Sequence, residues 1–213
     1  MIEDAIEGLK KELESYGEWN QGAIAKMVAD TGFHCKRCGK CCKNVWGDNT
    51  VSVFPGEVRA IVRATGMEWL EVARPMESCD ADESGEYHTF EWALQKQKNG
   101  DCKFLKNGAC TIYEVRPLIC RTYPMRLESG CLELYECDGL GFGPVPAEEA
   151  ESIAETLHER QVRETGETIM LLERFKPFHP STRDHSGDKV YVVHDSEGSR
   201  RVLARADGGF SFL

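Results

Sequence analysis

The sequence predicts an α+β protein: a small cysteine-rich, metal-binding core of hairpins and short helices, preceded by N-terminal helices and followed by a long C-terminal helix and a terminal β-hairpin. Three observations support this class: apolar residues at helical spacing near both ends, tight-turn signals between short β-prone segments, and ten cysteines in 213 residues. The chain is 41% hydrophobic and 29% charged, which is ordinary for a globular domain, and it is long enough to bury a core.

Residues 1–30 are expected to form an N-terminal helical segment. Its apolar residues recur every three or four positions and make one stripe: Ile2, Ile6, Leu9, Leu13 and Tyr16. We expect Gly17 to end this helix and Asn20 to cap a second helix that includes Val28.

Two helices and a strand are expected between residues 50 and 94. Pro55 opens a helix that ends near Gly66, and a short helix follows over residues 69–72. Residues 76–87 are expected to form an acidic loop. Apolar and polar residues then alternate over 88–94, which predicts a half-buried strand.

The strongest turn signal is Asn107-Gly108, which predicts a hairpin between residues 102–105 and 110–113. Farther along the chain, two prolines bracket a turn that holds Cys120. They are Pro117 and Pro124.

The remaining elements follow in order. A strand pair is expected over residues 125–135, with its turn at Ser129-Gly130. A long acidic helix over 146–175 comes next, with a break expected at Gly166, and the chain ends in a hairpin over 190–204.

We therefore divide the chain into three consecutive parts. Residues 1–30 are the helical segment, residues 31–145 are a cysteine-cluster metal-binding domain, and residues 146–213 are a C-terminal helix and hairpin packed on that same domain. No internal repeat is visible.

The net charge and the hydropathy of the chain argue against nucleic-acid and membrane partners and against export. The formal net charge of -10 argues against general affinity for nucleic acid or an anionic membrane. No apolar run approaches membrane-spanning length, and the start has no basic-then-apolar export signal. We expect a cytoplasmic protein. Since cytosolic thiols stay reduced, the ten cysteines favour metal ligation over disulfides.

The cysteine spacing after residue 34 is the most specific signal in the chain. Cys35, Cys38 and Cys41 follow one another at two-residue gaps, as in the ferredoxin-type run that binds a [4Fe-4S] cluster. A structural zinc site more often uses two separated pairs. Adjacent side chains on a helical turn diverge by about 100°. Cys41 and Cys42 are therefore not expected to bind one ion together: one of them serves a second centre or is a packed thiol, and either can complete the first group.

Four further cysteines are candidate ligands. They are Cys102, Cys110, Cys120 and Cys137. Together with the first four they make eight thiols, too many for one four-ligand centre, so two centres or one centre with spare thiols remain open. Cys79 and Cys131 have weaker context and are expected to be unligated.

Basic residues surround the first cysteine group in a protein that is acidic overall. They are Lys36, Arg37, Lys40 and Lys43. A four-thiolate zinc or oxidised [4Fe-4S] site carries about -2 net charge, which such cations would balance. Arg116 and Arg121 flank Cys120 in the same way. The competing interpretation is a basic patch for phosphate or RNA, with Trp46 nearby.

At these positions the chain resembles the YkgJ-like cysteine-cluster family, also called the putative zinc- or iron-chelating domain. The resemblance covers roughly residues 31–145. The matching segments are Phe33 to Cys42, Asp101 to Leu105, Cys110 to Glu114, Arg116-Pro117 with Cys120-Arg121, Tyr123-Pro124, and Cys137 with Gly139 and Gly141. It implies a cysteine-rich metal-binding domain with eight family positions: Cys35, Cys38, Cys41, Cys42, Cys102, Cys110, Cys120 and Cys137.

Three hypotheses follow for function. The leading one is a protein that holds an iron-sulfur cluster, of [4Fe-4S] type, and acts as a redox or electron-transfer accessory to a protein partner. The second is a zinc-stabilised protein-interaction module without redox chemistry. The third is an enzyme such as a protein lysine methylase, because a similar cluster occurs in flagellin lysine N-methylases. Oligomeric state is left open.

Overall fold

The computed structural model describes residues 2–45, 48–128, 130–181 and 187–213, and these residues fall into two compact units. We call residues 1–6, 50–95 and 167–213 the sheet unit, and residues 7–49 and 96–166 the thiol unit. Each unit is assembled from segments that are distant in the sequence. Two helices pass from one unit into the other: α1 (Ile2–Ser15) and α6 (Ala147–Arg174).

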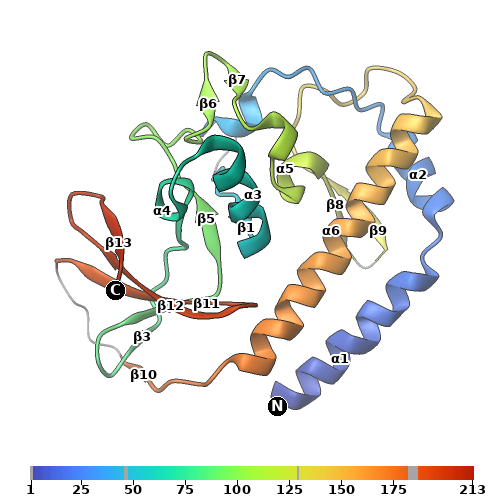
Figure 1. Cartoon of the computed structure of the whole chain (residues 1–213). Helices are drawn as coiled ribbons and strands as arrows, with labels where there is room; N and C mark the ends of the chain where they lie inside the picture. Colours follow the sequence, from blue (N-terminus) through green and yellow to red (C-terminus); the bar gives the residue numbers. More distant parts are fainter. Residues whose placement is uncertain (1, 46–47, 129, 182–186) are drawn as a thin grey trace. The chain divides into compact units, whose positions relative to one another are not determined.

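The sheet unit is built on a six-stranded sheet with the order β10-β3-β4-β11-β12-β13 (Figure 1). Its strands are β3 (Ala81–Asp82), β4 (Tyr87–Thr89), β10 (Pro180–Ser181), β11 (Lys189–Asp195), β12 (Gly198–Ala204) and β13 (Phe210–Phe212). The predicted terminal hairpin is confirmed as β11 and β12. It is longer than predicted and is joined by the additional strand β13.

A smaller three-stranded sheet and two helices complete this unit. The sheet has the order β1-β5-β2, with β1 (Ser52–Val53), β5 (Trp92–Leu94) and β2 (Ala73–Pro75). The predicted helices are α3 (Pro55–Thr65) and α4 (Trp69–Val72). In α3 the Glu57 carboxylate accepts a hydrogen bond from the Phe54 N–H, and Gly66 ends the helix at φ 71°.

The single strand predicted over residues 88–94 is wrong. The structure divides it into β4 and β5, which belong to different sheets and are separated at Phe90 and Glu91. All three residues of each strand are buried, so the half-buried alternation does not apply. The predicted acidic loop over 76–87 also contains β3.

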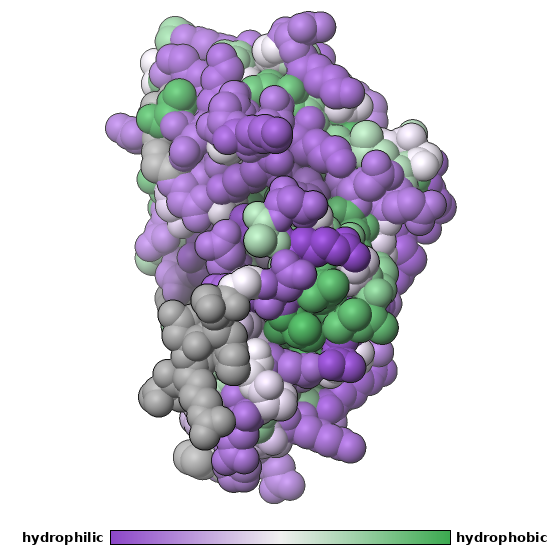
Figure 2. All heavy atoms as spheres, turned by 90° about the vertical axis from the view of Figure 1, so that its left-hand side faces the viewer, coloured by the Kyte–Doolittle hydropathy of each residue, from purple (hydrophilic) through white to green (hydrophobic). Residues whose placement is uncertain are grey.

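Surface hydropathy is uneven on the face that Figure 2 shows. Figure 2 looks from the side that carries β13 and shows a compact hydrophobic patch on a mostly hydrophilic surface. Phe212 and Leu213, at the end of β13, are exposed apolar side chains.

The thiol unit has a helical core. In α2 (Gln21–Asp30) the predicted cap is confirmed, because the Asn20 side chain accepts from the Ala23 N–H at 3.1 Å. Helix α6 runs without a break through Gly166, contrary to the expected interruption. The buried cluster of this unit joins α2, α6 and one hairpin, and consists of Ile24, Val28, Phe33, Met125, Leu127, Val145, Ala150, Ala154 and Leu157.

Two hairpins and a short helix carry the rest of the thiol unit. The Asn107-Gly108 hairpin is confirmed as β6 (Leu105–Lys106) and β7 (Ala109–Cys110), with positive φ at both turn residues, but each strand is only two residues long. The second hairpin is β8 (Met125–Glu128) and β9 (Cys131–Leu134); Ser129 in its predicted turn lies outside the described residues. The proline-bracketed turn is helix α5 (Leu118–Thr122).

No helix in the part of the chain that the structure describes is both long and apolar enough to cross a lipid bilayer.

Candidate metal centre

Main-chain hydrogen bonds hold the loop before Cys35 against the loop after Cys137. The His34 N–H donates to the Gly139 carbonyl at 2.8 Å, and the Phe142 N–H donates to the Gly32 carbonyl at 2.9 Å. The approach is so close at Gly139 that a Cβ there would lie 2.5 Å from the His34 carbonyl oxygen. A glycine is therefore needed at this position to bring the two loops together.

A second set of contacts holds the first cysteine loop against the hairpin. Gly39 has φ 69°, and a Cβ there would lie 2.7 Å from the Gly108 carbonyl oxygen. The Cys102 N–H donates to the Cys42 carbonyl at 2.8 Å, and the Asn49 side-chain amide donates to the same oxygen at 3.1 Å. These bonds place Cys42 beside Cys102, 60 positions later in the chain.

The sulfurs of Cys41 and Cys42 lie 4.0 Å apart, so the expected divergence of these neighbours is not observed. The two residues belong to a short 3-10 turn over Lys40–Cys42 rather than to an α-helix. Their shared hydrogen bond lowers the pKa of Cys41 to about 7. The same hydrogen bond, together with burial, raises the pKa of Cys42, because Cys42 holds the shared proton.

The downstream thiols lie within electrostatic reach of the first group. Burial raises the pKa of Cys137, and the nearby thiolates of Cys38, Cys35 and Cys41 raise it further. Burial likewise raises the pKa of Cys102, and Cys110 adds to that effect. The charges of Cys102 and Cys120 contribute to the raised pKa of Cys42 in the same manner. Metal binding at these sulfurs has to displace their protons.

Main-chain bonds and electrostatic contributions thus link the eight predicted positions, which lie on four segments of the thiol unit: 31–44, 102–110, the helix α5, and 136–142. Their role as ligands stays a prediction. Every one of the ten cysteines is a free thiol. Cys131 lies exposed on β9, and Cys79 belongs to the sheet unit.

Among the described residues, no three His, Cys, Asp or Glu side chains form a group that could hold a metal ion as they stand. Two thiolates bound to one tetrahedral zinc, at about 2.3 Å each, lie about 3.8 Å apart. The Cys41–Cys42 pair is near this separation, but no third donor completes the set. Thiolate sulfur is a donor that fits a thiophilic metal such as zinc, or an iron-sulfur cluster.

The basic residues near the cysteines have other partners as well. Lys40 forms an ion pair with Asp138 at 2.5 Å, which raises the pKa of Lys40. The ammonium of Lys36 lies over the Phe142 ring. Arg116 adds to the lowering of the Cys41 pKa, which the hydrogen bond with Cys42 mainly causes, and it opposes the burial that raises the pKa of Cys110. Trp46, part of the alternative nucleic-acid interpretation, lies outside the described residues.

Tyr123 is a site residue that the sequence analysis did not single out for a role. Its hydroxyl donates to the carbonyl of Glu136, the residue before Cys137. Burial raises the pKa of Tyr123 to about 12, and the nearby Cys137 and Cys41 contribute. Tyr123 therefore holds the Cys137 loop close to the thiols. Only its place in the motif that resembles the family drew attention to it beforehand.

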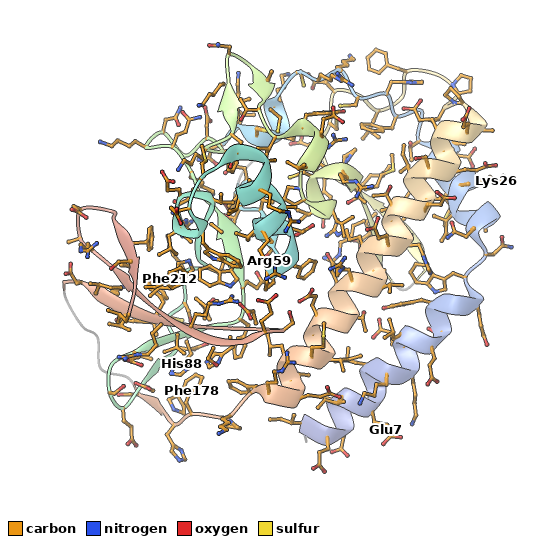
Figure 3. All side chains as sticks on the ribbon, in the orientation of Figure 1. Glu7, Lys26, Arg59, His88, Phe178 and Phe212 are labelled. Carbon is orange, nitrogen blue, oxygen red and sulfur yellow. The ribbon has the colours of Figure 1, made fainter. Side chains whose placement is uncertain are left out.

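The sheet unit contains a buried histidine pair that the sequence did not predict. The His88 Nδ1 lies 2.8 Å from the His194 Nε2, and the His194 Nδ1 lies 2.7 Å from the Ser199 hydroxyl. Asp82 lies 3.2 Å from the other nitrogen of His88. The Phe178 ring stacks on His88 at 3.7 Å between centroids, and Figure 3 shows these two side chains together. The pair was missed because its members are 106 positions apart.

A comparison with known protein families shows which family the chain belongs to. The model of the CxxCxxCC family, described as a putative zinc- or iron-chelating domain, matches residues 34–140. The chain belongs to the CxxCxxCC family. The match spans the first cysteine loop, the β6-β7 hairpin, α5 and the Cys137 loop, and also residues 50–95 of the sheet unit, so metal binding is supported for the chain. No curated protein and no solved structure matches the chain.

Proposed function

We propose that the thiol unit holds an iron-sulfur cluster, of [4Fe-4S] type, and that the chain acts as a redox or electron-transfer accessory to another protein. When bound, such a cluster supplies one-electron transfer. The residues of the chain would hold it through the first cysteine loop and the downstream thiols. Arg116 would balance part of its negative charge.

One observation carries this proposal. Eight thiols lie on four segments that main-chain bonds and electrostatic contributions link to one another. Several thiolate sulfurs are the ligands that iron-sulfur clusters use. The two-residue gaps of Cys35, Cys38 and Cys41 add the ferredoxin-type spacing.

One observation favours the second candidate, a zinc-stabilised interaction module. The 4.0 Å between the Cys41 and Cys42 sulfurs is close to the separation of two thiolates on one zinc ion. In that case the metal would only stabilise the loops and would carry no electrons.

Anaerobic purification followed by iron, sulfide and zinc analysis separates these candidates. The iron-sulfur proposal expects iron and acid-labile sulfide in equal amounts, with visible charge-transfer absorption that bleaches on reduction. Stoichiometric zinc without labile sulfide would reject it and support the zinc module.

The partner and the reaction are proposed at a coarser level. A protein partner is more consistent with the net charge of -10 than nucleic acid is. An enzyme that uses the cluster structurally, such as a protein methylase, is tested by equilibrium binding of S-adenosylmethionine to the metal-loaded chain. Absence of binding at saturating concentrations would reject that hypothesis.

A further inference from the structure

Exposure separates the eight thiols into two kinds. Cys35, Cys38 and Cys41 are exposed. Cys102 is buried, while the other four are partly covered: Cys42, Cys110, Cys120 and Cys137. The two neighbours Cys41 and Cys42 thus differ in exposure, although their sulfurs are in contact.

The three exposed thiols lie on the loop that is hydrogen-bonded to the Cys137 loop. The bonds from His34 to Gly139 and from Phe142 to Gly32 fix the Cys137 loop directly against the start of the first cysteine loop. Cys137 is also oriented locally, because the Gly139 N–H donates to its sulfur at 3.4 Å.

We group the buried and partly covered thiols Cys102, Cys110 and Cys120 with Cys42. The main-chain bond between Cys102 and Cys42 joins the end of the first loop to the hairpin. Cys110 lies opposite Leu105 in that hairpin, and the Leu105 N–H donates to the Cys102 carbonyl at 3.0 Å. Cys120, on α5, is partly covered, as Cys42 and Cys110 are.

We infer that the chain has two adjacent four-thiolate centres rather than one centre with spare thiols. This inference rests on the proposed metal-binding function, but not on which metal is bound. The outer centre is held by Cys35, Cys38, Cys41 and Cys137. The inner centre is held by Cys42, Cys102, Cys110 and Cys120.

This division assigns the two neighbours that the sequence could not assign. Cys41 faces outward and completes the ferredoxin-type run, while Cys42 is tied to Cys102 and completes the inner set. Since the two sulfurs are 4.0 Å apart, the centres adjoin each other through this pair. The outer centre, three of whose four side chains are exposed, exchanges metal with a chelator in solution faster than the inner one.

Metal content per chain tests the division. The double variant C35S/C38S removes half of the outer ligands and is expected to retain about half of the metal of the unsubstituted protein, whether iron or zinc. C79S/C131S is the matched control: it also removes two exposed thiols, both outside the proposed sets, and is expected to keep the full metal content.

Release of metal into excess EDTA, under anaerobic conditions, gives a second readout. The unsubstituted protein should lose its metal in two phases of similar amplitude, and C35S/C38S should lack the faster phase. Circular dichroism of C35S/C38S should match that of the control, because the substituted side chains are exposed and outside the buried core.

Failure of the two-centre division can be told apart from failure of the proposed metal-binding function. Loss of all metal from a folded C35S/C38S, or unchanged metal content, would overturn the two-centre division while leaving metal binding intact. A protein that binds neither iron nor zinc would instead reject the proposed function itself.

Discussion

The thiol unit and the sheet unit differ in the contacts that hold their reactive or buried polar side chains in place. In the thiol unit, most of the candidate ligands lie on loops held by main-chain hydrogen bonds, close approaches of glycine and side-chain bonds such as that of Tyr123 to Glu136. The apolar core of this unit lies on α2, α6 and the β8-β9 hairpin, and Cys137 packs against it. In the sheet unit, the buried polar groups are side chains on strands that are paired along their length.

This contrast predicts different sources of stability. Loops with few buried apolar contacts depend on a ligand to stay in one arrangement, so metal binding and loop order are coupled in the thiol unit. The sheet unit depends on hydrophobic burial and on hydrogen bonds among its own side chains. The stability of the sheet unit should therefore not change when metal is added or removed.

Metal removal should give the largest effect. Hydrogen exchange of the backbone amides over residues 31–44 and 102–113 is expected to speed up by about 100-fold or more after chelation, equivalent to about 3 kcal/mol. Amides of β11 and β12 should exchange at the same rate with and without metal. Equal acceleration in both units would contradict the comparison.

The matching test in the sheet unit is Asp195→Ala. The Asp195 carboxylate is 5% exposed and accepts hydrogen bonds from the Trp92 indole at 2.8 Å and from Arg200 at 2.5 Å. Removing it leaves the buried Trp92 indole N–H and the Glu197 main-chain N–H without their acceptor, while Arg200 loses its pair with Asp195 and keeps that with Glu197. This should cost about 3 kcal/mol in the free energy of unfolding.

Chemical denaturation and metal analysis check this prediction together. Asp195→Asn keeps an oxygen acceptor for the Trp92 indole and should cost less, about 1 kcal/mol. Metal content should be unchanged in both variants. A loss of metal from Asp195→Ala would show that the two units do not behave separately.

A glycine substitution sharpens the comparison inside the thiol unit. Gly139→Ala would place a methyl group 2.5 Å from the His34 carbonyl oxygen, so the two loops must move apart. We expect destabilisation of about 2 kcal/mol and a metal affinity at least about 10-fold lower.

Gly166→Ala is its control. Nothing lies within 4 Å of the added methyl group in α6, so helix propensity should raise stability by up to about 1 kcal/mol without changing metal affinity. Metal titration against a competing chelator measures both variants. Equal metal affinities would show that the contact between His34 and Gly139 does not position the thiols.

The smallest expected effect is a pH dependence confined to the sheet unit. Burial lowers the pKa of His194 below its ordinary 6.5, and the facing His88 lowers it further, while Asp195 acts in the opposite direction. The unfolded chain therefore binds the proton more readily, so stability is full above about pH 6.5 and falls as the pH drops below it.

Urea denaturation at pH 7.5 and pH 5.5 measures this loss, expected to be about 1 kcal/mol. The other groups around the pair do not reverse the sign. Ser199 is uncharged at both pH values, and Asp82 has a pKa of about 2, because hydrogen bonds from Ser84 and His88 outweigh the raising effect of burial. His194→Gln should flatten the dependence; an unchanged slope would assign it to other groups.

Local signals accounted for much of the fold. Asn20 caps α2, Pro55 and Gly66 bound α3, and Asn107-Gly108 turns the β6-β7 hairpin. Each of these signals acts on backbone angles or hydrogen bonds within a few residues, so the sequence alone could predict them. The spacing of the first cysteines and the motifs shared with the family were visible for the same reason.

Tertiary structure decided what depends on distant residues. It divided residues 88–94 between two sheets, paired His88 with His194, and placed Gly139 against His34 and Gly108 against Gly39. It also placed Cys42 beside Cys102. No periodicity along the chain encodes such contacts, because they arise only when segments far apart in sequence pack together and exclude water from the space between them.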